Sequence, residues 1–210
     1  MPKGAVADPK AFPPNMDGYT KGTKSQYAAM GFGYCLEGVS TKKIVESAFG
    51  PRPAYPSSPN HYGLDFSTSG ILGKKVVAVA NGKVTYIWQN EDGKGYAVEY
   101  ETDKIDPKTG EKLRVICMHL RDNPRLTFDL NDRVEKGITE IGRVGNTGSS
   151  AGPHLHFEVF NTGAIYSGDN RTFYNRINPV YFYPGFGLED NGNVSCPDGL
   201  SWDVADKYKY

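Results

Sequence analysis

Four histidines are the residues of this sequence best suited to chemistry, and each lies in a context that suits a metal ion. They are His61, His119, His154 and His156. His154 and His156 lie in a run that alternates like a strand, so both imidazoles should point to one face while Leu155 points to the other. Two imidazoles so close together suit a cation or a single reacting group, although an isolated pair of this kind also fits two surface histidines.

A second pair, His61 and Asp65, is four residues apart, a common reach for two ligands of one ion. Nitrogen and oxygen ligands suit zinc. Taken alone, this pair also fits chance or a local hydrogen bond. Asp65 stands between Leu64 and Phe66, which predicts the beginning of a buried strand. A carboxylate there needs a partner, because an unpaired buried charge is costly.

His119 closes a predicted strand at 113–118. Strand alternation places it on the face of Val115 and Cys117, where the ordinary interpretation is a structural histidine. The four histidines and Asp65 can converge only if their strands are neighbours, and one small sheet makes that easy. We therefore expect one site assembled from separate strands.

The elements that must position these residues have the pattern of strands. Short alternating runs separated by turn residues indicate a mainly β fold, an antiparallel sheet or sandwich. The dipeptide of Asn81 and Gly82 predicts a type I′ hairpin between the first two strands. The predicted strands are 75–80, 83–88, 95–100, 113–118, 140–144 and 154–159.

The domain organisation follows from where this pattern begins and ends. Residues 46–183 form the predicted main domain. Residues 1–45 are a predicted N-terminal extension with a short helix near 24–30. Residues 184–210, rich in Gly, Pro and Asp, are a predicted irregular C-terminal extension.

Composition argues against several classes of protein. The 24 Lys and Arg residues balance the 24 Asp and Glu residues, so the chain lacks the basic excess of a nucleic-acid binder. No apolar run approaches transmembrane length and no secretory signal is visible, so we expect a soluble protein without membrane insertion. The three cysteines, Cys35, Cys117 and Cys196, match no zinc pattern, and the apolar surroundings of Cys117 favour a buried free thiol.

Three motifs occur in order along the chain: His-x-x-x-Asp at His61, a lone His followed by Leu at His119, and Gly-Pro-His-Leu-His-Phe-Glu ending at Glu158. Together they resemble the lysostaphin-like (LytM-type) zinc endopeptidases, over roughly residues 49–183. The combination is far more specific than any of its parts.

The resemblance implies one zinc ion per chain, held by His61, Asp65 and His156. It implies that His119 and His154 are catalytic and do not bind the metal. A catalytic zinc has three protein ligands and an open position for water, whose pKa it lowers to about 7. Two free histidines then move protons and stabilise the oxyanion. The sequence leaves open which of them is the base, and we take His154 as the first candidate for the base and His119 for the oxyanion stabiliser.

Candidate substrate contacts are less specific. Arg52 and Asn146 lie in segments similar to family motifs, and the ring of Tyr96 is suited to stacking on peptide or glycan. The loops at 100–114 and 163–176 are longer or more polar than the family minimum and are expected to line the substrate groove.

The implied function is hydrolysis of peptide cross-links or stem peptides in bacterial peptidoglycan, at the cell wall. One alternative is a zinc carboxypeptidase that removes terminal D-Ala, with Glu158 as its catalytic carboxylate. Another is a structural component of a phage tail or secretion particle that retains the fold. A hydrolase carried on a phage or secretion particle would be both an enzyme and a component of that particle.

Overall fold

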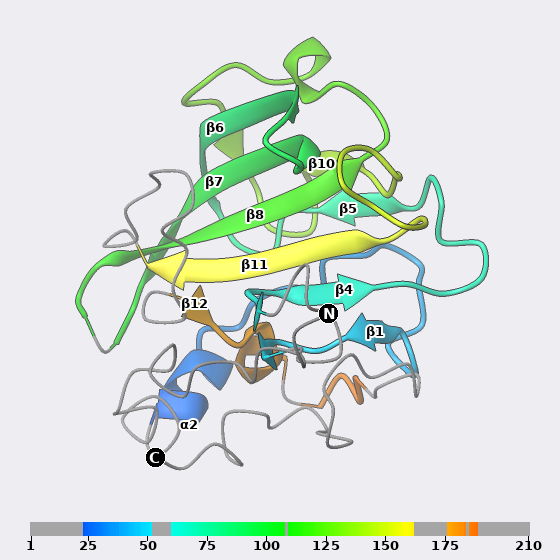
Figure 1. Ribbon diagram of the computed structural model, residues 1–210. Coiled ribbons are helices and arrows are strands. Elements are labelled where there is room, and N and C mark those ends of the chain that lie inside the picture. Colours follow the sequence, from blue (N-terminus) through cyan, green and yellow to red (C-terminus); the bar gives the residue numbers. More distant parts are fainter. Residues whose placement is uncertain (1–22, 52–59, 108, 162–175, 184, 189–210) are drawn as a thin grey trace, which may run out of the picture.

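A computed structural model describes residues 23–51, 60–107, 109–161, 176–183 and 185–188. Its centre is one antiparallel sheet with the strand order β1-β4-β11-β8-β7-β6-β9, and β12 pairs with β11 (Figure 1). The predicted mainly β, antiparallel class is therefore confirmed. The strands of this sheet are β1 (Val45–Ser47), β4 (Leu64–Phe66), β6 (Gly82–Glu91), β7 (Gly95–Ile105), β8 (Lys112–Leu120), β9 (Arg133–Val134), β11 (Leu155–Asn161) and β12 (Arg176–Ile177).

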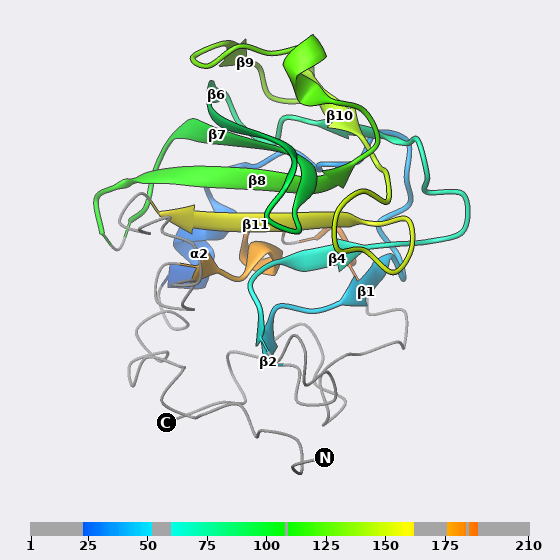
Figure 2. The same cartoon turned by 45° about the horizontal axis from the view of Figure 1, so that its top comes forward.

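The turned view shows β9 and the 3-10 helix η2 (Pro124–Leu126) beyond β6 at one edge of this sheet, and β4 and β1 toward the other edge (Figure 2). Among the described residues, no helix has the length and apolar character needed to cross a membrane. The smaller elements are α2 (Thr23–Ala28), β2 (Gly50–Pro51), β3 (Asn60–His61), β5 (Lys75–Val77), β10 (Glu140–Arg143), η2 (Pro124–Leu126) and η4 (Pro179–Phe182).

The predicted hairpin at Asn81 and Gly82 is wrong. Strand β5 pairs with β10 in a separate two-stranded sheet, while β6 pairs with β7 and β9. Neither residue has the positive φ that a type I′ turn requires. Gly82 has a different physical role, since a Cβ there would lie 2.2 Å from the carbonyl oxygen of Glu101 on β7. This glycine permits close approach of two strands and does not make a turn.

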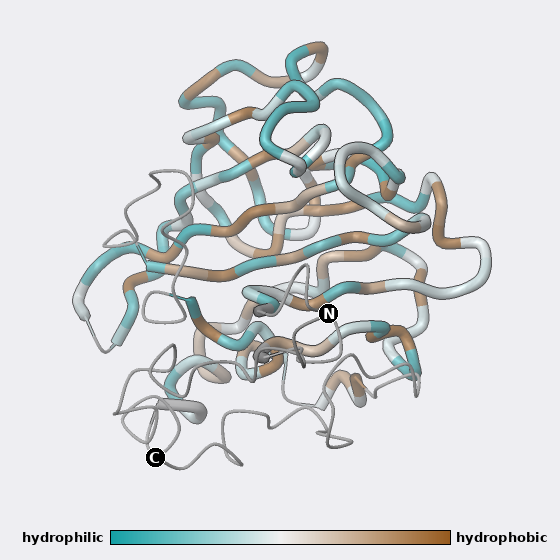
Figure 3. Tube along the Cα trace, in the orientation of Figure 1, coloured by the Kyte–Doolittle hydropathy of each residue, from teal (hydrophilic) through white to brown (hydrophobic). Residues whose placement is uncertain are grey.

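The two faces of the central sheet carry apolar clusters of different size. One face carries the main core, which β5, β10 and η4 help to enclose. The other carries a small cluster formed by Trp88, Ala97, Ile116, Met118 and Phe160. Apolar residues follow the strands, and polar residues gather in the outer loops (Figure 3).

Strand β11 shows how sequence alternation creates these two faces. Leu155, Phe157 and Val159 belong to the main core. His156 lies directly opposite Met118 of β8, on the face of the smaller cluster, as the side-chain period of two requires. The predicted common face for the two histidines of this segment agrees with this arrangement.

The described part of the predicted N-terminal extension shares the main core. Tyr27, Phe32 and Leu36 are buried there. The ring of Tyr27 lies 5.1 Å from that of Phe182 in η4, and α2 and η4 lie side by side in both cartoons (Figures 1 and 2). The boundary at residue 45 stays a prediction, and most of 184–210 lies outside the described residues.

Two of the three cysteines are described, and both are buried free thiols. Cys35 and Cys117 are members of the main core, as predicted for Cys117. Burial raises the pKa of both thiols, so little reactive thiolate forms at neutral pH. Cys196 lies outside the described residues.

Candidate metal centre and catalytic site

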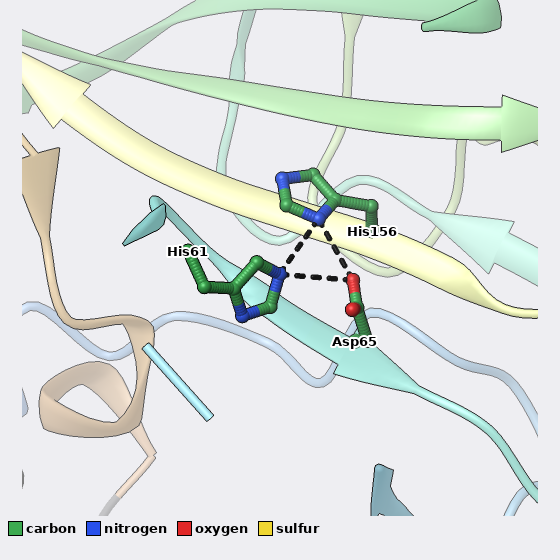
Figure 4. A group of neighbouring side chains, drawn as sticks. All are labelled: His61, Asp65 and His156. Carbon is green, nitrogen blue, oxygen red and sulfur yellow. Dashed lines mark hydrogen bonds and ion pairs between the residues drawn. The ribbon is translucent and has the colours of Figure 1, made fainter. Parts of the chain in front are cut away.

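His61, Asp65 and His156 converge beside the paired strands β4 and β11 of the central sheet (Figure 4). His61 ends β3, Asp65 is the middle residue of β4, and His156 lies opposite Asp65 on β11. The Asp65 Oδ1 atom lies 3.1 Å from His61 Nε2 and 2.7 Å from His156 Nδ1, and these two nitrogens are 3.0 Å apart. Pairing of β4 with β11 therefore brings together residues that are 91 positions apart in sequence.

The tautomers of both imidazoles direct lone pairs into this cluster. A carbonyl oxygen only accepts hydrogen bonds, so the 2.7 Å contact with Ala48 O makes His61 Nδ1 a donor and leaves the Nε2 lone pair facing Asp65. For His156 the roles reverse. Its Nε2 donates to Glu158 Oε1 at 3.0 Å, and its Nδ1 faces Asp65 and His61. Such contacts from the second ring nitrogen are what orient metal-binding histidines.

The donor set fits a zinc ion. Two imidazole nitrogens and one carboxylate oxygen form a three-ligand catalytic set, with the fourth position left for water. Tetrahedral bonds of about 2.0–2.1 Å place ligand atoms about 3.3 Å apart. The observed separations of 2.7–3.1 Å would need to widen by about 0.2–0.6 Å to reach this spacing.

The electrostatics of the cluster favour a positive charge at its centre. Burial favours the neutral form of Asp65, but His61 and His156 outweigh it and hold the pKa of this carboxyl well below its usual range. Burial likewise lowers the pKa of His156, but hydrogen bonds to Asp65 and Glu158 raise it to about 9. A proton or a metal cation is thus strongly favoured beside the Asp65 carboxylate.

His119 and His154 lie beside this cluster with their rings facing each other. Their ring centroids are 4.6 Å apart. His119 Nδ1 donates to Thr147 O at 2.8 Å, and His154 Nδ1 donates to Gly152 O at 2.9 Å. Both Nε2 atoms are therefore directed away from the backbone, and that of His154 lies 3.7 Å from Asp65 Oδ1.

A β-bulge brings His119 into the site, and its predicted face was wrong. Strand β8 places Met118 and His119 opposite the single residue Ala97 of β7, and His119 has a φ of 59°. The bulge turns the imidazole to the face of His156, 6.2 Å from that ring, while Leu120 enters the main core. Strict alternation would have placed His119 in that core.

The environment of His119 keeps its imidazole neutral. Burial lowers the pKa of His119, the neighbouring His156 and His154 lower it further, and the resulting value is about 4. A neutral ring whose Nδ1 carries the hydrogen has an unprotonated Nε2. This nitrogen is therefore available as an acceptor near neutral pH.

The three predicted substrate contacts do not form one cluster in the described residues. Arg52 lies outside the described residues. Asn146 is exposed, next to Thr147, whose carbonyl holds His119. The ring of Tyr96 packs partly buried against the main core, and its backbone N–H donates to Thr147 Oγ1 at 3.0 Å.

The predicted loop at 100–114 is largely strand in its described residues, and its contact with a substrate groove stays a prediction. Strands β7 and β8 extend to Ile105 and from Lys112, so the connection is short. It lies near Asn161, five residues along β11 from His156, or about 16 Å. Asp106 fixes it by accepting hydrogen bonds from Tyr27 and Asn161. Almost all of 163–176 lies outside the described residues.

Sequence reasoning missed three contributors to the site. The carbonyls of Ala48 and Thr147 orient histidines, and no sequence pattern marks a backbone atom for such a role. Arg176 donates to Glu158 Oε2 at 2.8 Å, which only the pairing of β12 with β11 reveals.

The antiparallel sheet and the His-Asp-His cluster define a class: a β domain with the donor set of a metallohydrolase. A model of peptidase family M23 matches residues 59–167, more than half of the 210 residues. The chain belongs to peptidase family M23. This confirms the predicted lysostaphin-like family and the predicted enzyme class, a metallopeptidase.

Each match to an individual relative spans only part of that relative's length. The chain is 34% identical over 111 residues to "Glycyl-glycine endopeptidase ALE-1" of Staphylococcus capitis, covering 52% of this chain and 27% of that protein. It is 30% identical over 141 residues to an "Uncharacterized metalloprotease" of Haemophilus influenzae, covering 66% and 27%. The chain thus spans about a quarter of these curated relatives.

The solved structures to which this chain is similar include a lysostaphin domain and LytU. The lysostaphin catalytic domain from Staphylococcus simulans has 28% identity and a TM-score of 0.48, covering 64% of this chain and 87% of that one. LytU has 30% identity and a TM-score of 0.49, covering 67% and 83%.

Proposed function

We propose that this chain is a zinc-dependent endopeptidase that hydrolyses peptide bonds in bacterial peptidoglycan and therefore acts at the cell wall. The observation that carries the proposal is the pairing of a three-ligand cluster with two histidines outside it. The cluster is His61, Asp65 and His156, and the two further residues are His119 and His154. Family membership adds support, and the name of the Staphylococcus capitis relative suggests glycyl-glycine bonds as first candidates.

One zinc ion, held by the three ligand residues, would supply a Lewis acid and lower the pKa of a water molecule at the site. The roles of this chain's own residues follow from their tautomers. His119 Nε2 is unprotonated and accepts a proton from the attacking water. Thr147 O holds the opposite ring nitrogen and fixes the direction of the imidazole.

In this proposal His154 takes the complementary role, which reverses the preference drawn from the sequence. Its Nε2 lies 3.7 Å from Asp65 Oδ1, so a hydrogen on this nitrogen would be directed toward developing negative charge. Gly152 O holds the Nδ1 hydrogen, so the ring presents Nε2 alone. The proton taken by His119 then passes to the leaving amine.

The geometry argues against the carboxypeptidase alternative. That alternative needs the Glu158 carboxylate as a catalytic base beside the metal. Glu158 instead contacts His156 Nε2, across the ring from the Nδ1 that faces Asp65. Its second oxygen accepts from Arg176, so neither oxygen is directed into the cluster.

The test is digestion of purified peptidoglycan with glycine-containing and direct D-Ala-linked cross-bridges, with and without a zinc chelator. Mass spectrometry of the fragments should show new cross-link-derived termini that disappear with the chelator. Release of single terminal D-Ala residues would favour the carboxypeptidase. Bound zinc without any product from either wall type would favour a structural role, such as a component of a phage or secretion particle.

A further inference from the structure

Glu158 and Arg176 form a buried ion pair directly behind the metal-facing histidine. Glu158 is fully buried, and the side chain of Arg176 is only 3% exposed. Arg176 Nε donates to Glu158 Oε2 at 2.8 Å, while Glu158 Oε1 accepts from His156 Nε2 at 3.0 Å. The guanidinium also lies over the ring of Phe160, at 4.5 Å.

The sheet register explains why these groups meet. His156, Glu158 and Phe160 follow one another on the same face of β11, with the strand period of two. Arg176 of β12 lies directly opposite Phe160, one step along that face from Glu158. A chain of contacts thus runs from Arg176 through Glu158 to His156 and ends at Asp65.

A need for stability does not explain this arrangement. Two charges removed from water lose solvation, and a well-packed apolar pair is often as stable or more stable than a buried ion pair. The pair does something that apolar residues cannot do, because Glu158 accepts a hydrogen bond from one particular nitrogen of His156. That contact decides which ring nitrogen carries the hydrogen.

We propose that Glu158 and Arg176 are positioning residues of the metal centre, a proposal that rests on the proposed zinc site. Glu158 keeps the hydrogen of His156 on Nε2 and so presents the Nδ1 lone pair to the ion. Arg176 holds the second oxygen of Glu158, which prevents the carboxylate from rotating into the cluster as an extra ligand. Removing a hydrogen-bond partner that orients a metal-binding histidine weakens metal affinity about 10-fold to 100-fold.

The experiment measures the zinc dissociation constant by competition with a chromogenic chelator. The double variant Glu158→Met/Arg176→Met leaves no unpaired buried charge, so it should fold. A control is Asp103→Met/Arg133→Met, which removes another ion pair of the same sheet (2.7 Å) that contacts no histidine in the described contacts. Melting temperatures of the metal-free proteins verify folding.

The zinc dissociation constant should rise about 10-fold to 100-fold in the Glu158/Arg176 variant and stay within about threefold in the control. Cleavage by the first variant should recover at saturating zinc with an unchanged KM. Equal affinities in both double variants, whether wild-type-like or equally weakened, would overturn the positioning role while leaving the zinc site intact. Failure of the wild-type protein to bind zinc would instead overturn the proposed function, and the positioning role with it.

Discussion

His119 and His154 lie with ring centroids 4.6 Å apart, and each donates its Nδ1 hydrogen to a backbone carbonyl. Rigid backbone thus sets the direction of both rings before any substrate arrives. Their Nε2 atoms lie on the side of the sheet where His61, Asp65 and His156 converge. This preorganisation leads to predictions that separate metal binding from catalysis.

Removal of the metal should abolish cleavage and lower the melting temperature, because a ligand that binds only the folded state stabilises it. The stabilisation is about 2.7 kcal/mol at a free zinc concentration of 100 times the dissociation constant. Thermal melts with and without chelator, followed by zinc addition, measure both effects. The Asp65→Ala variant should show neither cleavage nor stabilisation by zinc. The Asp103→Ala variant, which removes only a surface partner of Arg133, should show both.

Substitution of the two histidines outside the cluster should lower kcat without loss of zinc. His119→Ala and His154→Ala should each reduce kcat about 10²-fold to 10⁴-fold, the usual contribution of a positioned acid or base. Zinc content per chain, measured by elemental analysis, should match that of the wild type. His61→Ala is the contrasting variant, because it removes a donor of the cluster. Equal loss of zinc in all three variants would contradict the division between ligands and catalytic groups.

The ring of His119 should remain neutral throughout the neutral and mildly acidic range. Its pKa falls to about 4 because of burial and neighbouring histidines, so protonation begins only as the pH drops toward that value. A bound zinc ion is positive and shifts this pKa in the same direction. NMR titration of the ring should show no midpoint above pH 5. A midpoint between 6 and 7 would contradict the lowered pKa of this ring.

The β-bulge at His119 should reverse the usual stability order of alanine and glycine. Because φ is 59° there, a side chain with Cβ is strained by about 1–2 kcal/mol relative to glycine. His119→Gly should therefore have a higher free energy of unfolding than His119→Ala by about 1 kcal/mol. Both variants lack the imidazole, so the difference, measured by urea denaturation, isolates the backbone.

Gly148→Ala should destabilise the loop that holds His119. Gly148 has a φ of 72°, and a Cβ there would lie 2.3 Å from Gly95 N. The control is Gly137→Ala, since Gly137 has a φ of 70° and open space around it. We expect Gly137→Ala to lose about 1 kcal/mol from backbone strain and Gly148→Ala about 1–3 kcal/mol more from overpacking. Urea denaturation measures both losses, and equal losses would mean that the contact with Gly95 is unimportant.

The sequence by itself determined which residues to expect at the site. Through the family resemblance its motifs imply His61, Asp65 and His156 as metal ligands, and alternation along the strand places His154 and His156 on one face. The structure brings the three side chains together, and the alternation depends only on local period, which neighbouring strands do not change.

Only the tertiary structure decided the remaining features of the site. The bulge at His119 depends on Ala97 in the neighbouring strand, so local alternation predicted the wrong face. The tautomers depend on Ala48 O, Thr147 O and the Glu158 carboxylate, which approach the rings from other segments. Period-two alternation describes one strand in isolation, whereas pairing register and backbone contacts are properties of the assembled sheet.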